Sequence, residues 1–139
     1  MVYRIGIKNQ ADKEVSKIHK FTDLFAWQEG HKLVILIYQI TKDFPPEERY
    51  CLVDQMRRAV VSFTSNIAEG FSRRSAKEKY QFYSTAKGSM TELQNLLLIA
   101  KDVGYIRQEV FSKVAKQSVI SNKLLTGLLK ATRLKSYES

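Results

Sequence analysis

The scarcity of residues that break helices constrains the fold of this chain more than any other feature of its sequence. Its 139 residues include two prolines, adjacent at Pro45 and Pro46, and six glycines. Gly70 and Gly104 stand where the apolar periodicity stops, as is typical of helix ends. The long stretches between these positions therefore predict long helices.

Local signals place the ends of these helices. The residue before a proline avoids helical geometry, so the first helix ends at Phe44. Ser75 followed three residues later by Glu78 is a capping-box pattern, and it begins the third helix. The expected helices span residues 23–43, 47–69, 75–103 and 107–135.

Four helices with short connections predict an all-α fold, an up-down-up-down antiparallel four-helix bundle. The length and the even composition of the chain favour one domain, over residues 21–139. Residues 1–20 show no firm period. We expect them to form a basic N-terminal arm, either mobile or folded as a short extra element.

Apolar residues at helical spacing indicate which side of each helix faces the core. The stripe of the second helix runs from Leu52 to Ile67, and that of the third runs from Phe82 to Ala100. The fourth helix has a sparser stripe, formed by Val110, Val114, Leu125 and Leu128. The first helix is apolar on two sides, and its predicted core face comprises Leu24, Trp27, Val34, Ile35 and Tyr38.

Apolar residues outside these predicted core faces would be exposed to water in a single chain. Exposed apolar stripes of this length usually mark a partner surface, which predicts a homo-oligomer, with ordinary surface leucines as the alternative. Gly88 interrupts the third helix at a cost of about 1 kcal/mol relative to Ala. A neighbouring subunit, a ligand backbone or neutral tolerance would each explain that glycine. The predicted oligomer interface comprises Leu33, Leu36, Ile37, Ile40, Gly88, Leu96 and Ile99.

A polar strip follows one edge of the apolar stripe on the second helix. Its members recur every three or four residues, so they are neighbours on the helix surface. Such a strip suits hydrogen bonds and ion pairs to another helix or subunit, with Glu69 or Glu92 as partners for the arginines. The predicted polar seam comprises Gln55, Arg57, Arg58, Ser62, Asn66, Glu69 and Glu92.

The sequence predicts no catalytic residues, no metal site and no cofactor. Ser62 has no histidine near it in sequence to act as a base, and His31 is interpreted as a packing residue. Cys51 has no Cys or His at metal-ligand spacing, and no glycine-rich phosphate loop is found. A hydrolase built on Ser62 or Glu69 is a distant alternative.

The compartment is inferred from cysteine usage and hydropathy. A lone Cys51 cannot form an internal disulfide, and the sequence shows no secretory leader, so we expect a cytoplasmic protein. The longest apolar run, Leu33 to Ile40, is far shorter than the roughly 20 residues of a membrane-spanning helix. No membrane partner is expected.

The charge balance favours a polyanionic partner. The chain carries 23 Lys and Arg against 14 Asp and Glu, a net charge of +9. RNA or DNA is therefore a predicted partner, contacted through its backbone, and a solvated lysine face is the alternative. The predicted contact residues are Arg73, Arg74, Lys77, Lys79, Lys116, Lys123, Lys130 and Arg133.

One stretch carries a family resemblance. The segment 21–106, which includes QMRRAVVSFTSNIAEG from Gln55 to Gly70, resembles the four-helix bundle proteins encoded in intervening sequences of bacterial 23S ribosomal RNA genes. The matching positions are Leu24, Trp27, Tyr38, Thr41, Phe44, Pro45, Glu48, Leu52, Gln55, Arg57, Arg58, Ala59, Ser62, Asn66, Ile67, Ala68, Glu69, Gly70, Phe82, Ala86, Gly88, Ser89, Glu92 and Leu93.

This resemblance implies a small helical bundle that assembles into a ring, a pentamer, with no known catalytic activity. The chain is also similar to the basic accessory proteins of diversity-generating retroelements, which bind nucleic acid and a reverse transcriptase. We therefore expect a non-enzymatic oligomer that binds nucleic acid. The alternative is a scaffold that recruits a protein partner, such as an accessory subunit of a reverse-transcriptase complex.

Overall fold

Four long α-helices account for most of residues 18–138, the part of the chain that this computed structural model describes. They are α2 (Phe25–Thr41), α3 (Leu52–Ser72), α4 (Ala76–Asp102) and α5 (Gln108–Glu138). Two short 3-10 turns, η1 (Phe21–Asp23) and η2 (Pro46–Glu48), precede α2 and α3. No strand occurs in this part of the chain, so the all-α prediction is confirmed. Most of the predicted arm, residues 1–17, lies outside the described residues.

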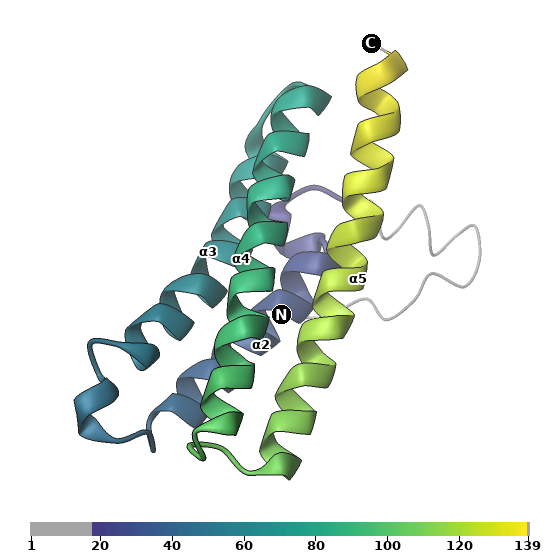
Figure 1. Cartoon of the computed structure of the whole chain (residues 1–139). Helices are drawn as coiled ribbons and strands as arrows, with labels where there is room; N and C mark the ends of the chain where they lie inside the picture. The colour runs from purple at the N-terminus through teal and green to yellow at the C-terminus, as the bar shows by residue number, and fades with distance from the viewer. Residues whose placement is uncertain (1–17, 139) are drawn as a thin grey trace.

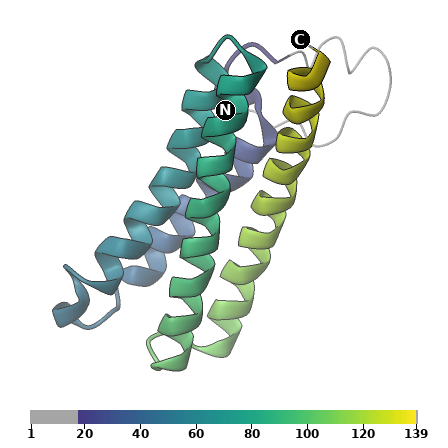
Figure 2. The ribbon, with the colours of Figure 1, turned by 45° about the horizontal axis from the view of Figure 1, so that its top comes forward.

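The helices form a four-membered arrangement in which successive helices run in opposite directions (Figure 1). Each helix contacts two neighbours: α2 and α4 both pack against α3, and α5 packs against α4 and α2. The view turned by 45° shows the same order of the four rods (Figure 2). In the described bundle, α2 does not contact α4 and α3 does not contact α5. The four helices therefore stand at the corners of a square and surround one shared core.

The helix ends follow local hydrogen bonds. The Ser75 hydroxyl accepts a hydrogen bond from the Glu78 backbone N–H at 3.1 Å, as the capping-box pattern predicts for the start of α4. The predicted first turn of α3 is instead the turn η2. The Glu48 carboxylate accepts from the Leu52 backbone N–H at 3.3 Å, and the helix begins there, five residues later than expected.

The two connections at the lower end of Figure 1 are tied together. The Tyr105 hydroxyl, between α4 and α5, donates to the Glu48 carboxylate at 2.7 Å. The Phe44 and Tyr105 rings contact each other with centroids 5.3 Å apart. The hydrogen bond to Glu48 raises the pKa of Tyr105. These contacts fix the turn η2 against the opposite hairpin.

The predicted inward faces of α3 and α4 are confirmed. The α3 stripe from Leu52 to Ile67 is buried, and the α4 stripe is buried apart from the half-buried Phe82. The buried members of the two stripes are Leu52, Val53, Met56, Ala59, Val60, Phe63, Ile67, Tyr83, Ala86, Met90, Leu93, Leu97 and Ala100. These two stripes make up much of the core.

The predicted core face of α2 was correct only in part: Leu24, Trp27 and Val34 pack against the core as predicted. Leu33 and Ile37, assigned to an oligomer interface, have no exposed surface and belong to the core of the single chain. Ile35 and Tyr38, assigned to the core, are 47% and 39% exposed. The inward face is instead set by small residues, because α2 meets α3 at Gly30, where an added Cβ would lie 2.6 Å from the Phe63 ring.

The other members of the predicted oligomer interface are also partly buried in the core and partly exposed. Leu96 is 5% exposed and therefore also belongs to the core. Leu36 and Ile40 are half-buried and pack against the core. Gly88 and Ile99 are exposed, as predicted. Burial within one chain thus removes Leu33, Ile37 and Leu96 from any surface that a second copy could meet.

The core-facing side of α5 includes polar positions that hydrophobic periodicity does not reveal. Val114 and Leu125 are fully buried, as predicted, but Ser118 and Ser121 lie between them. The Ser118 hydroxyl donates to the Ala115 carbonyl at 2.7 Å, so it can be buried without losing its hydrogen bond. Small hydroxyl side chains therefore complete the stripe.

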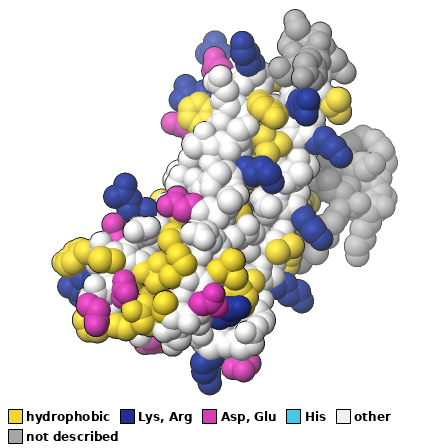
Figure 3. Space-filling view, in the orientation of Figure 1, with side chains coloured by type: hydrophobic (Ala, Val, Ile, Leu, Met, Phe, Trp, Pro, Cys, Tyr) yellow, Lys and Arg dark blue, Asp and Glu magenta, His cyan; other side chains and the backbone are white. Residues whose placement is uncertain are grey.

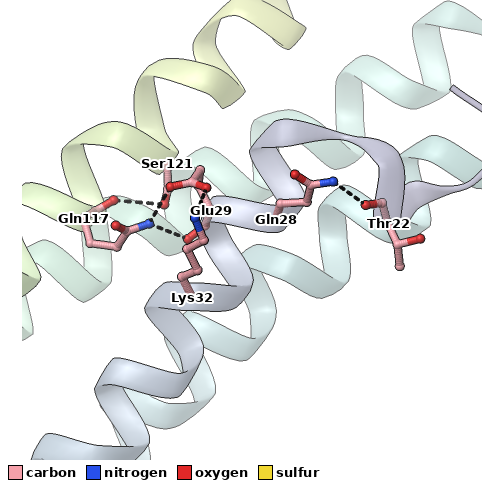
Figure 4. A network of polar contacts seen from close by, with 6 residues as sticks. All are labelled: Thr22, Gln28, Glu29, Lys32, Gln117 and Ser121. Carbon is pink, nitrogen blue, oxygen red and sulfur yellow. Dashed lines mark hydrogen bonds and ion pairs between the residues drawn. The ribbon is translucent and has the colours of Figure 1, made fainter. Parts of the chain in front are cut away.

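A polar cluster joins α2 to α5 on the side opposite the α3–α4 pair (Figure 4). The Gln117 side-chain amide of α5 donates to the Glu29 carbonyl at 2.9 Å and to its carboxylate at 3.2 Å. The Ser121 hydroxyl donates to the Gln117 carbonyl, and Lys32 lies 2.7 Å from the Glu29 carboxylate. This cluster fixes the register of the first and last helices.

The contact at Gly30 makes a prediction about stability. Adding a methyl group there forces the fully buried Phe63 ring to move, an overpacking cost of about 1–3 kcal/mol. The better helix propensity of alanine offsets about 1 kcal/mol of that cost. We expect Gly30→Ala to lower the free energy of unfolding by up to about 2 kcal/mol, measured by urea denaturation.

Gly127→Ala is the matched control, because nothing lies within 4 Å of the Cβ that it adds to α5. It should raise the free energy of unfolding by up to about 1 kcal/mol. Equal effects of the two substitutions would contradict the close approach of α2 to α3.

Candidate functional site

Seven cationic side chains come together at one end of the bundle, which we name the cationic end. The end of α3, the start of α4 and the last turns of α5 meet there, at the top of Figure 1. Dark-blue side chains gather at this end and along the edge formed by α5 in Figure 3. The cationic end comprises Arg73, Arg74, Lys77, Lys79, Lys130, Arg133 and Lys135.

Two of these cations are held by the bundle itself. The Arg73 guanidinium lies 4.6 Å from the centre of the Phe82 ring and 3.6 Å from the Glu69 carboxylate. The Lys79 ammonium donates to the Phe71 carbonyl at 2.6 Å and to the Gly70 carbonyl at 3.4 Å. Lys79 therefore donates hydrogen bonds to carbonyls at the end of α3 that have no partner within the helix.

The charges at this end are poorly compensated. Arg74, Lys77, Lys79, Lys130 and Lys135 form no ion pair with a carboxylate among residues 18–135, whose side chains the structure describes. Burial lowers the pKa of Lys79, and the nearby charge of Lys135 lowers it further. This end therefore presents a concentrated positive potential.

Carboxylates gather at the opposite end, where α2 meets α3 and α4 meets α5. Magenta side chains are more frequent there in Figure 3. The acidic residues of these two connections and the adjoining helix ends are Asp43, Glu47, Glu48, Asp54, Asp102 and Glu109. The antiparallel topology thus brings the basic end of α5 beside the α3–α4 turn, whereas the opposite end mixes its carboxylates with Lys42, Arg49, Lys101 and Arg107.

The remaining predicted nucleic-acid contacts, Lys116 and Lys123, lie farther back along α5. Both are exposed, as is Lys130 in the same series. The structure therefore divides the predicted set into a cluster at the end of the bundle and a stripe on one helix. Lys135 belongs to the cluster and was missed, because its place beside Lys79 depends on how α5 folds back.

The predicted polar seam exists, but it is smaller than expected. The Ser62 and Ser89 hydroxyls lie 2.8 Å apart and join α3 to α4. The Asn66 amide donates to the Ser62 carbonyl at 2.8 Å and to its hydroxyl at 3.1 Å. A neighbouring pocket of about 410 Å³ is lined by Asp54, Gln55, Arg58, Ala59, Ser62 and Glu92.

Two members of the predicted seam lie elsewhere. Arg57 donates to the Thr41 hydroxyl at 3.0 Å and lies over the Tyr38 ring at 4.6 Å, so it joins α3 to α2. Glu69 pairs with Arg73 at the cationic end. Arg58 shares a pocket with Glu92 but forms no ion pair with it.

The seam offers no activated nucleophile within the described residues. The hydrogen-bond partners of the Ser62 hydroxyl are Ser89 and Asn66, and neither side chain is a base. His31 stacks on Trp27 with ring centroids 4.8 Å apart, in agreement with the predicted packing role.

Across residues 18–138, no three metal-ligating side chains lie close enough to hold an ion. None of the helices in that range has the length and hydropathy needed to cross a bilayer.

Comparison with known proteins agrees with this geometry. Residues 22–127 match the model of the 23S rRNA-intervening sequence protein family. The chain belongs to this family. The resemblance noted in the sequence is thereby confirmed.

One solved structure shares the fold of this family member. It is a protein of unknown function from the S23 ribosomal protein family of Bacteroides thetaiotaomicron, which superposes with a TM-score of 0.70 at 21% sequence identity. The similarity covers 76% of this chain and 98% of the other. No curated protein matches the chain.

The family match ends at residue 127, whereas α5 continues to Glu138. Lys130, Arg133 and Lys135 lie in this last part of α5. The cationic end therefore combines the α3–α4 turn, which lies within the family match, with a helical extension that follows the matched residues.

The contact between Ser62 and Ser89 can be measured by a double-mutant cycle. A partly buried hydroxyl pair at 2.8 Å should contribute about 0.5–1.5 kcal/mol to the free energy of unfolding. We expect Ser62→Ala and Ser89→Ala to show a coupling energy of that size in urea denaturation.

The control cycle uses Ser65→Ala and Ser84→Ala, which change exposed serines on the same two helices. Their effects should add to within about 0.3–0.5 kcal/mol. Additivity at Ser62 and Ser89 as well would show that the seam does not couple α3 to α4.

Proposed function

We propose that the protein binds the phosphate backbone of RNA or DNA through the cationic end and that it catalyses no reaction. The observation that carries this proposal is the gathering of seven cations from the α3–α4 turn, α4 and α5, with five of them unpaired with any described carboxylate. Lysines and arginines placed in this way release counterions from a polyanion when they bind it. The single exposed Cys51 fits a reducing cytoplasm.

The arrangement favours the backbone over the bases. The cations lie at the end of the bundle, on the α3–α4 turn, the start of α4 and the last turns of α5 (Figures 1 and 2). Positive side chains on such a surface position a nucleic acid without reading its sequence. The stripe of Lys116 and Lys123 extends the positive surface along α5. A structured duplex can therefore contact both regions.

Neutralising cations at this end should weaken binding and reduce its salt dependence. In the variant Arg74→Gln/Lys77→Gln/Lys130→Gln, three possible phosphate contacts are lost. For duplex DNA, the slope of log Kobs against log salt concentration should become shallower by about 2–3, at roughly 0.9 per contact. Fluorescence anisotropy with a labelled duplex between low and moderate salt measures this slope.

The matched control, Lys42→Gln/Arg49→Gln/Arg107→Gln, removes the same charge at the opposite end of the bundle. It should change the slope far less. An equal decrease in slope in both variants would show that binding depends only on net charge and not on the cationic end. Absence of binding at low salt would overturn the proposal. Capture of an acidic protein that survives nuclease treatment, with only weak nucleic-acid affinity, would favour the scaffold instead.

We further propose that copies of the chain assemble into a ring, a pentamer as the sequence resemblance implies. The support is apolar surface that remains exposed after the helices have packed. At the end of α4, Leu98, Ile99 and Val103 are 47%, 41% and 56% exposed. A second exposed group lies on α2 and α3 and comprises Ile35, Tyr38 and Val61. Apolar groups of this kind suit contacts between subunits.

A charge at the end of α4 should disrupt this assembly. We expect Ile99→Lys to lower the molar mass measured by light scattering, because the exposed side chain meets a neighbour in the ring. Val119→Lys is the control, since Val119 is exposed to a similar degree on the lysine-bearing side of α5. A wild-type chain with the mass of one copy at ordinary ionic strength would contradict the ring.

A further inference from the structure

A pocket of about 400 Å³ opens at the cationic end, between the start of α4 and the last turns of α5. Most of its wall is apolar and is formed by Ile18, Leu24, Phe71, Tyr83 and Leu128. Three cations, Arg74, Lys79 and Lys135, also line it. No carboxylate is among the described residues around it. The pocket therefore combines an apolar wall with uncompensated positive charge.

The Tyr83 hydroxyl adds a hydrogen-bond donor to this pocket. Tyr83 lines the pocket and is only 2% exposed, and its hydroxyl forms no hydrogen bond with residues 18–138. Burial raises the pKa of Tyr83 to about 12, so the hydroxyl keeps its proton at neutral pH. Among the described residues, the hydroxyl is not one of the fully buried polar atoms without a partner, so it is accessible from the pocket and can donate to an acceptor there.

Lys79 lies one helical turn before Tyr83 on α4, so the two side chains share one side of the helix. Its ammonium is held by the carbonyls of Gly70 and Phe71 and lies 5.2 Å from the centre of the Phe71 ring. The charge of Lys135 lies near enough to lower the pKa of Lys79. An anion in this position would relieve the repulsion between the two ammonium groups.

We propose that this pocket binds a small amphiphilic anion, a carboxylate that carries an apolar chain. Its head group accepts hydrogen bonds from Lys79, Lys135 and the Tyr83 hydroxyl, and its chain packs against the apolar wall. A bare anion would leave the apolar wall in contact with water, and a neutral chain would leave the cations without a counterion. Pockets of this size and lining are typical of small-molecule sites.

The pocket depends on the part of α5 that extends past the family match. Leu128, Thr132 and Lys135 follow residue 127, where the match ends, and all three line the pocket. The Thr132 hydroxyl donates to the Leu128 carbonyl at 2.7 Å, so its proton is not available to a ligand. The donors that remain are Arg74 and those assigned to the head group.

Calorimetric titration of the full chain with decanoate, below its micelle concentration, tests the proposal. We expect saturable binding of one decanoate per chain. Acetate provides the head group alone and decanol the chain alone, and each should bind at least about tenfold more weakly, because either one loses half of the contacts. Affinity for inorganic phosphate equal to that for decanoate would overturn the amphiphile in favour of a bare-anion site.

Three substitutions locate the site. Tyr83→Phe removes only a hydroxyl, and Lys135→Gln changes an exposed residue, so each should weaken decanoate binding by about five- to tenfold without unfolding the chain. Ala131→Trp fills the exposed rim of the pocket and should abolish binding. Lys123→Gln removes the same charge from the same helix away from the pocket and should leave the affinity unchanged.

Failure of decanoate to bind, or equal binding by all four variants, would overturn the proposal. Circular dichroism of each variant separates a lost site from a lost fold. The titration contains no nucleic acid, so its outcome is independent of the proposed binding of RNA or DNA.

Discussion

Two close approaches of an aromatic ring to a glycine set the geometry on which the rest of the bundle depends. Phe63 of α3 lies against Gly30 of α2, and Tyr83 of α4 lies against Gly70 of α3; in both cases an added Cβ would be 2.6 Å from the ring. Such contacts let helix axes come closer than larger side chains would allow. The second contact also brings the end of α3 to the start of α4, and the cations of that turn become neighbours.

The polarity of the charge distribution follows from this topology. Basic residues are frequent in the α3–α4 turn and at the end of α5, two segments that are far apart in the sequence. An antiparallel bundle of four helices places both at one end, while the α2–α3 and α4–α5 connections carry their carboxylates to the other. The uneven placement of charge over the described bundle can orient a polyanion as well as attract it.

The sequence predicts the helices and the inward faces of α3 and α4, because their apolar stripes are continuous and regular. It succeeds only in part on α2, where Trp27 packs against the core as predicted but Tyr38 is exposed, and where α2 meets α3 at the small residue Gly30. Helix packing depends on how closely two backbones approach, and apolar periodicity does not record that distance. The pocket at the cationic end was not predictable, since Ile18, Phe71 and Lys135 become neighbours only in the folded chain.

The cationic end has an energetic consequence for the fold itself. Lys79 and Lys135 are close in the folded chain, whereas unfolding separates them, so their repulsion acts against folding. Part of this cost is offset by the hydrogen bonds from Lys79 to the carbonyls at the end of α3. An anion that binds only the folded form stabilises it in proportion to RT ln(1 + [L]/Kd). Ligand binding and the docking of α5 onto the α3–α4 turn are therefore thermodynamically linked, because the same lysines take part in both.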